Sequence, residues 1–396
     1  MAEPLVGLRI IDMTSVLMGP YATQILGDYG ADVIKIESPA GDTTRGVGPM
    51  RTEGMGHIFL HANRNKRSVV LDLKQPAGLD ALMQLAKTAD VLISNVRPAA
   101  MARLGVTYEK LAEANPRIIV LSLVGYGQKG PYAAKPAYDD LVQGVAGIPS
   151  LVAASGTPEP RYVPVTIVDR AVALNAVNAI LAALYSRDRT GEGQAIEIPM
   201  FETITQFVMG DHLGGLTFDP PIGPAGYPRL LTPDRRPYAT RDGYICVLVY
   251  TDRNWRAFLE EIGKPDLFEK DPRFATLGKR TENISALYAM VSEAMATRTT
   301  REWLDTLERL DIAAMPMHTP ESLLDDPHMR AVDFFRVVNH PTEGSIREMA
   351  VPGTWSKTQP TSRLPAPKLG QHSREVLREA GLADEVIDKV TGNKAG

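Results

Sequence analysis

The stretch Leu8–Glu37, LRIIDMTSVLMGPYATQILGDYGADVIKIE, decides the fold, because it predicts a strand, a helix and a second strand in succession. Leu8–Met13 is the first strand, Tyr21–Tyr29 is a helix closed by Gly30, and Asp32–Glu37 is the second strand. Strands that alternate with helices predict a Rossmann-like α/β fold with a mainly parallel sheet covered on both faces. The same alternation continues with strands at 68–72, 91–94, 117–124 and 194–198 and helices at 78–88 and 108–114.

The chain has 396 residues, which is enough for two or three domains. Prolines crowd the stretch between Pro220 and Pro237 and exclude regular helix there, so the sequence predicts a break between domains. We expect a large domain over 1–200, a linker over 201–225, a smaller α+β domain over 226–330, and a return linker with the C-terminal part of the large domain over 331–396.

Composition narrows the classes of function. There are 43 basic and 47 acidic residues, so charge gives no reason to expect nucleic acid as a partner. The single cysteine, Cys246, cannot form an internal disulfide, and we expect it to be buried in a strand over 244–250. The N-terminus does not resemble a signal peptide, and no apolar run approaches the roughly 20 residues that span a bilayer. These features predict a cytoplasmic protein without a membrane segment.

Two motifs resemble known cofactor or metal sites, but neither has the context that such a site requires. Gly125–Gly130 fits G-x-G-x-x-G, but Pro131 follows where a dinucleotide site needs a helix. We therefore expect a loop at the end of a strand, where it could still line a ligand site. His57 and His61 are one helical turn apart, but no cysteine or carboxylate cluster accompanies them, so we expect no metal site.

Asp169 has two compatible interpretations. It ends the extended segment 163–168 and stands where a long helix is predicted to begin. The structural interpretation is a helix N-cap that accepts N–H bonds from the first turn. The functional interpretation is a nucleophile, because a helix start lowers the pKa of a carboxyl and keeps it ionised.

A family resemblance covers nearly the whole chain in order. Leu5–Thr14, Gly30–Glu37, Asn65–Lys74 and Thr190–Gln194 resemble the class III CoA-transferases, which include formyl-CoA transferase and the carnitine CoA-transferases. Further matching segments are Asp90–Asn95, Arg103–Gly105, Asn115–Arg117, Gly125–Gly127, Gly130–Tyr132, Tyr138–Asp139 and Leu369–Ser373. The α-methylacyl-CoA racemases belong to the same superfamily.

The resemblance implies a set of site residues. The family's nucleophilic aspartate falls on Asp169, and the catalytic histidine of the racemases falls near Tyr138. Coenzyme A is expected as a substrate, with no tightly bound cofactor and no metal. The CoA cleft implied by position consists of Val16, Leu17 and Met18 near the thioester, Ser38, Leu71, Asp72, Leu73, Lys74, Asn95, Val96 and Arg97 along the CoA, Arg103 and Lys135 at its phosphates, and Tyr138.

The resemblance also implies a reaction, an acyl-CoA and a carboxylic acid as partners, and an interlocked homodimer. Asp169 would pass through an acyl anhydride and an aspartyl-CoA thioester. Leu17 stands where formyl-CoA transferase has glutamine, which argues against formate and oxalate. Arg161, Arg170 and the basic stretch 227–236 suit a dicarboxylate such as succinate, or they hold the linker in place.

Two alternatives stay open. An acyl-CoA racemase or epimerase would share the fold, although Tyr138 in place of histidine argues against it, because a phenol is a poor base at neutral pH. A CoA-binding protein without catalysis is the other alternative.

Overall fold

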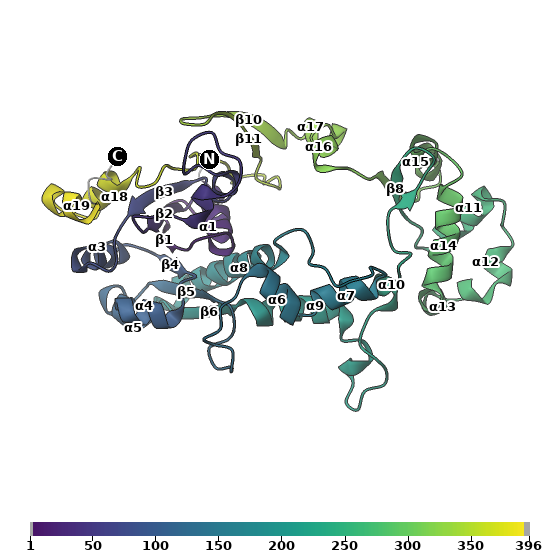
Figure 1. Ribbon diagram of the computed structural model, residues 1–396, viewed down its shortest axis with the longest axis horizontal. Helices are drawn as coiled ribbons and strands as arrows, with labels where there is room; N and C mark the ends of the chain where they lie inside the picture. Colours follow the sequence, from purple (N-terminus) through teal and green to yellow (C-terminus); the bar gives the residue numbers. More distant parts are fainter. Residues whose placement is uncertain (1–2, 392–396) are drawn as a thin grey trace. The chain divides into compact units, whose positions relative to one another are not determined.

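The computed structural model describes residues 3–391 and divides into two compact units. The first unit comprises Met1–Ala146, Val165–Gln206 and Pro327–Gly396 (Figure 1). The second comprises Gly147–Pro164 and Phe207–Asp326. The second unit therefore takes in residues 147–164, which the sequence analysis had placed in the large domain.

The first unit is built on a six-stranded sheet in the order β3-β2-β1-β4-β5-β6, in which every neighbouring pair is parallel. This order runs outward in both directions from the contact between β1 and β4, which makes that contact the topological switch point. The predicted Rossmann-like sheet is confirmed. Its strands are β1 Arg9–Met13, β2 Asp32–Glu37, β3 Lys66–Val70, β4 Val91–Ser94, β5 Ile119–Val124 and β6 Ala195–Pro199.

Helices cover both faces of the sheet (Figure 1). On one face α1 Met18–Asp28 packs against α8 Ile167–Thr190 and the strands beneath. On the other face alternate strand residues such as Ile11 and Ile34 form one apolar core with helix residues such as Leu82. The helices on that face are α3 Pro76–Ala86, α5 Tyr108–Ala114, α18 Ser373–Glu379 and α19 Asp384–Thr391.

The remaining elements of the first unit are short. A hairpin pairs β10 Phe335–His340 with β11 Gly344–Met349 in antiparallel register. The others are η1 Thr43–Gly46, α2 His57–Ala62, α4 Pro98–Leu104, α6 Asp139–Val145 and α17 Pro327–Ala331.

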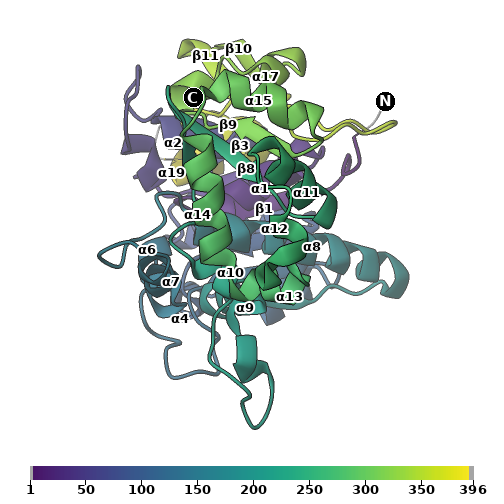
Figure 2. The same cartoon turned by 90° about the vertical axis from the view of Figure 1, so that its right-hand side faces the viewer.

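The second unit has an antiparallel sheet in the order β7-β8-β9, packed with helices (Figure 2). Its core includes Trp255 and Trp303, each nearly fully buried. A capping box of Thr299 and Glu302 starts the helix that follows Thr299. The elements are α7 Ile148–Ala154, η2 Gly214–Thr217, α10 Pro228–Leu231, β7 Tyr238–Ala239, β8 Tyr244–Leu248, α11 Asp252–Glu261, α12 Leu267–Lys270, η3 Pro272–Phe274, α13 Leu277–Glu282, α14 Ile284–Met295, α15 Thr300–Arg309, β9 Ala313–Pro316 and α16 Pro320–Leu323.

Three local expectations were wrong. The residues 201–225, expected as a linker, include most of a regular helix, α9 Met200–His212. The helix α1 begins at Met18, three residues before the predicted start, since Pro20 fits the first turn of a helix, where its missing N–H has no intrahelical role. Cys246 is exposed, because its position on β8 alternates with buried Ile245.

One helix in the described part of the chain, α8, is long and apolar enough by composition to cross a membrane, which the sequence analysis had not expected. It packs against α1 and against strands β5 and β6 of the sheet. On its inner face Val172, Ala176 and Ile180 are fully buried, whereas Leu174 is half exposed. Core packing therefore accounts for part of its apolar composition.

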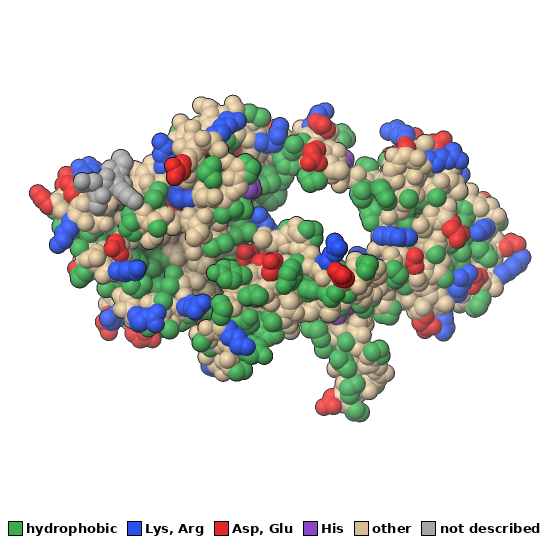
Figure 3. Space-filling view, viewed as in Figure 1, with side chains coloured by type: hydrophobic (Ala, Val, Ile, Leu, Met, Phe, Trp, Pro, Cys, Tyr) green, Lys and Arg blue, Asp and Glu red, His purple; other side chains and the backbone are tan. Residues whose placement is uncertain are grey.

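The loop after α9 in the second unit carries exposed apolar side chains (Figure 3). Phe218 is 54% exposed and Ile222 is 74% exposed, although isolated large apolar side chains on a surface are common. Leu213 and Leu216 add to the same short stretch. The four side chains form a local apolar surface on this unit.

Candidate active site

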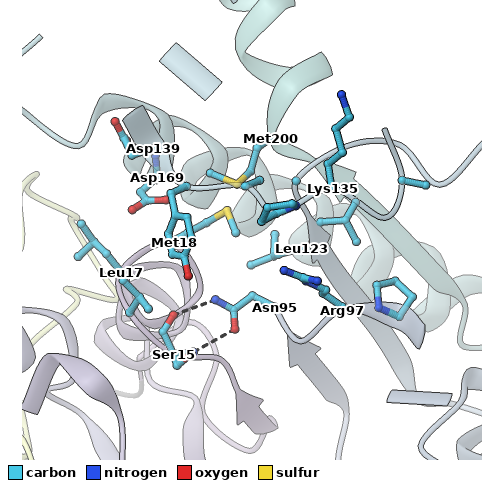
Figure 4. A pocket seen from close by; sticks show the side chains of 18 of the residues that line it. Ser15, Leu17, Met18, Asn95, Arg97, Leu123, Lys135, Asp139, Asp169 and Met200 are labelled. Atoms are coloured by element: carbon cyan, nitrogen blue, oxygen red, sulfur yellow. Dashed lines mark hydrogen bonds between the residues drawn. The ribbon is translucent and has the colours of Figure 1, made fainter. Parts of the chain in front are cut away.

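A cavity of about 230 Å³ lies within the first unit, at the carboxyl ends of β1, β4 and β5 (Figure 4). Open parallel sheets bind ligands at such ends, beside the topological switch point. The loop after β1 supplies one wall and the loops after β4 and β5 supply the others. The lining residues are Ser15, Val16, Leu17, Met18, Asn95, Arg97, Pro98, Leu123, Val124, Gly125, Gln128, Ala133, Lys135, Pro136, Ala137, Tyr138, Asp139, Asp169 and Met200.

Asp169 lies in the first turn of α8 and lines the cavity. The helix begins at Ile167 and its N-cap is Thr166, so the interpretation of Asp169 as the N-cap was wrong. The backbone N–H of Asp169 is instead bound by another side chain, since it donates to Oδ2 of Asp139 at 3.0 Å. The Asp169 carboxylate is therefore free of the capping role that would have occupied it.

Asp139 is the second carboxylate of the site. It begins α6, is 8% exposed and accepts a hydrogen bond on Oδ1 from the Gln143 amide at 2.6 Å. Its position beside the N-terminus of α8 places two carboxylates on one wall of the cavity (Figure 4). Like charges held close together disfavour ionisation of at least one member of the pair.

The electrostatics of Asp169 correct the expectation from sequence. Burial, and then repulsion from Asp139, raise the pKa of Asp169 to about 7, and Arg170 opposes them only in part. The position at a helix start had predicted a lowered pKa, but the N–H of Asp169 donates to Asp139. A carboxylate with a raised pKa is a stronger base and a stronger nucleophile once it is ionised.

The basic groups of the cavity are Arg97 and Lys135. The ammonium of Lys135 lies 4.1 Å from the centre of the Tyr132 ring. The guanidinium of Arg170 stacks over Tyr21, 4.7 Å from the ring centre, and so lies against α1. Two cations at the cavity suit a ligand that carries negative charge.

The loop after β1 is held tightly. The backbone N–H and carbonyl of Ser15 bond to the two side-chain atoms of Asn95 at 3.0 and 2.8 Å. Val16 has a φ of +71°, which is rare for a β-branched residue. The wall that faces Asp169 is therefore a strained segment with a fixed shape.

The Gly125–Gly130 segment is a loop, as predicted, and not the start of a helix. Gly125 and Gln128 line the cavity, and the N–H of Gly127 donates to Glu202. The expectation that this loop contributes to a site is consistent with the cavity. Within residues 3–391, no three His, Cys, Asp or Glu side chains are grouped so that they could hold a metal ion.

The cavity brings together eight of the residues expected from sequence and leaves out the others. Leu71 is buried in the core and Ser38 and Arg103 are exposed elsewhere. Asp72 lines a separate cavity of about 320 Å³ beside Pro39 and Lys389. The eight are Val16, Leu17, Met18, Asn95, Arg97, Lys135, Tyr138 and Asp169, and those outside are Ser38, Leu71, Asp72, Leu73, Lys74, Val96 and Arg103.

Three lining residues were not expected from the sequence: Asp139, Ser15 and Met200. Asp139 lies in the matching segment Tyr138–Asp139, and its place after a loop and before a helix was the available signal. Met200 follows β6 directly, so it shares the carboxyl edge of the sheet with the other loops. No spacing in the sequence brings Asp139 to Asp169, because 30 residues separate them.

Comparisons with known proteins agree on one family. The sequence matches CoA-transferase family III over residues 5–373. A succinate–glutarate CoA-transferase from Agrobacterium fabrum is 34% identical, with 95% of each chain covered. A formyl-CoA:oxalate CoA-transferase from Streptomyces coelicolor is 32% identical, over 98% of this chain and 97% of the relative. The crystal structure of a CaiB/BaiF family protein from Brucella suis aligns with a TM-score of 0.80 and 30% identity, covering 96% of this chain and all of that one. The chain belongs to CoA-transferase family III.

Proposed function

We propose that this family III CoA-transferase moves coenzyme A from an acyl-CoA to a carboxylic acid, with Asp169 as the covalent nucleophile. The observation that carries the proposal is the half-buried Asp169 carboxylate on the wall of the cavity, with Arg97 and Lys135 on the same cavity. Its pKa of about 7 leaves a substantial ionised fraction at neutral pH and makes that fraction basic.

The first half of the reaction transfers CoA to the enzyme. A carboxylate oxygen of Asp169 attacks the thioester carbonyl carbon, the C–S bond breaks, and the CoA thiolate leaves an acyl-aspartyl anhydride. The thiolate then attacks the side-chain carbonyl carbon of Asp169, and the donor acid departs as a carboxylate. The enzyme now carries an aspartyl-CoA thioester, in which the thioester energy is retained.

The second half repeats these steps with the acceptor. The acceptor carboxylate attacks the aspartyl thioester and releases the thiolate, which forms a second anhydride. The thiolate attacks the acceptor's carbonyl carbon, giving the new acyl-CoA and the free carboxylate of Asp169. No net proton is taken up or released, so the site needs only to hold charge and to exclude water.

Dicarboxylates are the proposed class of acceptor. Arg170 acts on the charge of Asp169, and a second carboxylate on the substrate would pair with such a cation. The Agrobacterium fabrum relative is named for succinate and glutarate, which are dicarboxylates, whereas the Streptomyces coelicolor relative is named for formyl-CoA and oxalate, and Leu17 argues against formate and oxalate in this chain. A screen of acyl-CoA donors against mono- and dicarboxylate acceptors, read by the masses of new CoA thioesters, tests this class.

The covalent steps have their own test. Wild-type protein incubated with acyl-CoA and then with hydroxylamine should carry a modified Asp169 in peptide mass spectra, and Asp169→Asn should not. Deuterium exchange at the α-carbon of the acyl group without such a modification would favour a racemase and contradict the proposal. The interlocked homodimer implied by the family resemblance is part of the proposal, and light scattering of the purified protein at several concentrations tests it.

A further inference from the structure

In the loop between β1 and α1, every backbone polar group from the N–H of Thr14 to the N–H of Val16 forms a hydrogen bond with a side chain. Such a loop is over-determined, because Asp12 binds the first of these groups and side chains from other parts of the unit bind the rest. In chain order the partners are Oδ1 of Asp12 at 2.9 Å, Nζ of Lys35 at 2.8 Å, Oδ1 and Nδ2 of Asn95 at 3.0 and 2.8 Å, and Oδ1 of Asp42 at 3.2 Å.

The backbone conformation of Val16 explains why the loop needs these hydrogen bonds. Its left-handed backbone, with a φ of +71°, is unfavourable for a residue branched at Cβ. Conformations of this kind persist only where the surrounding structure enforces them, and they concentrate at functional sites. Val16 lines the cavity that holds Asp169.

Asp42, which accepts the hydrogen bond from the N–H of Val16, belongs to a buried ion pair. Oδ2 of Asp42 lies 2.9 Å from Nζ of Lys35, and both side chains are almost completely buried. Lys35 holds the carbonyl of Thr14, so one ion pair fixes the chain on both sides of Ser15. Oδ1 of Asp42 also accepts from the N–H and hydroxyl of Thr44, which fixes the direction of the carboxylate.

We propose that Asp42 is a positioning residue for the CoA transfer: paired with Lys35, it holds Val16 in its left-handed conformation, so that the Val16–Met18 wall keeps its place opposite Asp169. The inference rests on the proposed role of Asp169. A wall displaced by about 1 Å costs on the order of 100-fold in rate, because the acyl carbonyl loses its alignment with the attacking oxygen. Asp42 does not line the cavity, so it acts through the loop, directly at Val16 and through Lys35 at Thr14.

The first experiment compares Asp42→Ala with Asp28→Ala. Asp28 is a matched control, because it is also a buried aspartate paired with a buried cation, Arg64 at 2.8 Å, and it does not line the cavity. Both variants should lose thermal stability. Asp42→Ala should lower kcat about 30-fold with the KM for acyl-CoA within about threefold, whereas Asp28→Ala should leave both within about twofold. Equal kcat for the two folded variants would overturn the inference.

A double-mutant cycle with Val16→Gly separates positioning from a general structural role. Glycine adopts the left-handed conformation without the steric cost, so it depends less on Asp42. In the Val16→Gly background, Asp42→Ala should lower kcat by less than about threefold. The same loss in both backgrounds would mean that Asp42 acts independently of Val16 and would overturn the inference.

A third measurement tests the left-handed conformation of Val16, on which the inference depends, and it can be made even if Asp42→Ala does not fold. Glycine is normally less stable than alanine at a given position, and the order reverses where φ is positive. Val16→Gly should therefore melt above Val16→Ala, and the opposite order would overturn the inference. Failure of the proposed function would appear differently, as a wild-type enzyme that forms no adduct at Asp169.

Discussion

Two carboxyl groups of the same unit, Asp12 and Asp169, have pKa values that are shifted in opposite directions. Asp12, on β1, is fully buried, and burial alone would raise its pKa, but Lys66 and Lys35 outweigh burial and lower it. Burial raises the pKa of Asp169 too, and repulsion from the Asp139 carboxylate adds to the rise, so that the pKa is about 7. Burial raises the pKa of both carboxyl groups, and the charged partners decide whether that rise is reversed, as at Asp12, or increased, as at Asp169.

The difference separates a structural group from a reactive one. Asp12 is bonded to Lys66 at 3.0 Å and to the hydroxyls of Thr14 and Thr23, so its charge is neutralised and its lone pairs are occupied. Asp169 lines an open cavity without a comparable set of partners. The first arrangement stabilises the fold, and the second leaves a basic oxygen available for chemistry.

Replacing Asp169 should have the largest effect. Asp169→Asn keeps the shape of the side chain but removes the nucleophile, so the rate of CoA exchange should fall by about 10³-fold or more. Asp12 serves as the contrast, because its carboxylate should not form a hydroxylamine-sensitive adduct. Thioester exchange followed by mass spectrometry measures the effect, and an undiminished rate in Asp169→Asn would remove the distinction between the two groups.

The complementary change should damage stability. Asp12→Asn leaves the buried ammonium groups of Lys66 and Lys35 without their main counter-charge, so the free energy of unfolding should fall by about 3–5 kcal/mol. Urea unfolding followed by circular dichroism gives the value. A loss below about 1 kcal/mol would show that the charge of Asp12 is not needed to balance the lysines.

The raised pKa of Asp169 predicts a gain in stability on its removal. Because the folded pKa of about 7 lies above the unfolded value of 3.8, the folded state binds the proton more tightly, and stability falls as the pH rises between these values. Asp169→Asn should therefore be more stable than wild type by about 2 kcal/mol above pH 7, after allowance for solvent screening. The two proteins should converge near pH 4 in urea unfolding, and a constant difference across this range would contradict the shift.

The smallest effect concerns the neighbour of the nucleophile. Asp139→Asn removes the repelling charge, while its amide oxygen can still accept from the N–H of Asp169. The pKa of Asp169 should fall, so the acid limb of kcat/KM against pH should move to lower pH. The activity at pH 8 should change by less than about tenfold. An acid limb that stays in place would mean that Asp139 does not set the charge of Asp169.

Much of the fold could be read from local patterns. The strand Val91–Ser94 and the helix Tyr108–Ala114 have the predicted bounds, since apolar periodicity and flanking turns mark them. The α9 helix was not predicted, because residues 201 onward were assigned to the linker together with the proline-rich stretch after Pro220. Cys246 was misplaced because an apolar run does not reveal which face of the strand is covered.

The site was only partly predictable. Loops that directly follow strands, such as Val16–Met18 and Asn95–Arg97, could be placed together, because parallel strands end at one edge of the sheet. The role of Asn95 could not, since its amide binds the backbone of Ser15. The residues expected along the rest of the CoA, such as Ser38 and Arg103, lie outside this cavity and stay predictions.

By itself, the sequence determined the parallel sheet, the helix that carries Asp169 and the family, because local periodicity or motifs in a fixed order along the chain indicate each of them. Only the tertiary structure decided the state of Asp169 and the shape of the wall opposite it. Both depend on side chains that are distant in sequence, Asp139 for the charge and Asp42 for the loop. Electrostatic and hydrogen-bonding partners act through distances of a few ångströms in space, and spacing along the chain does not record them.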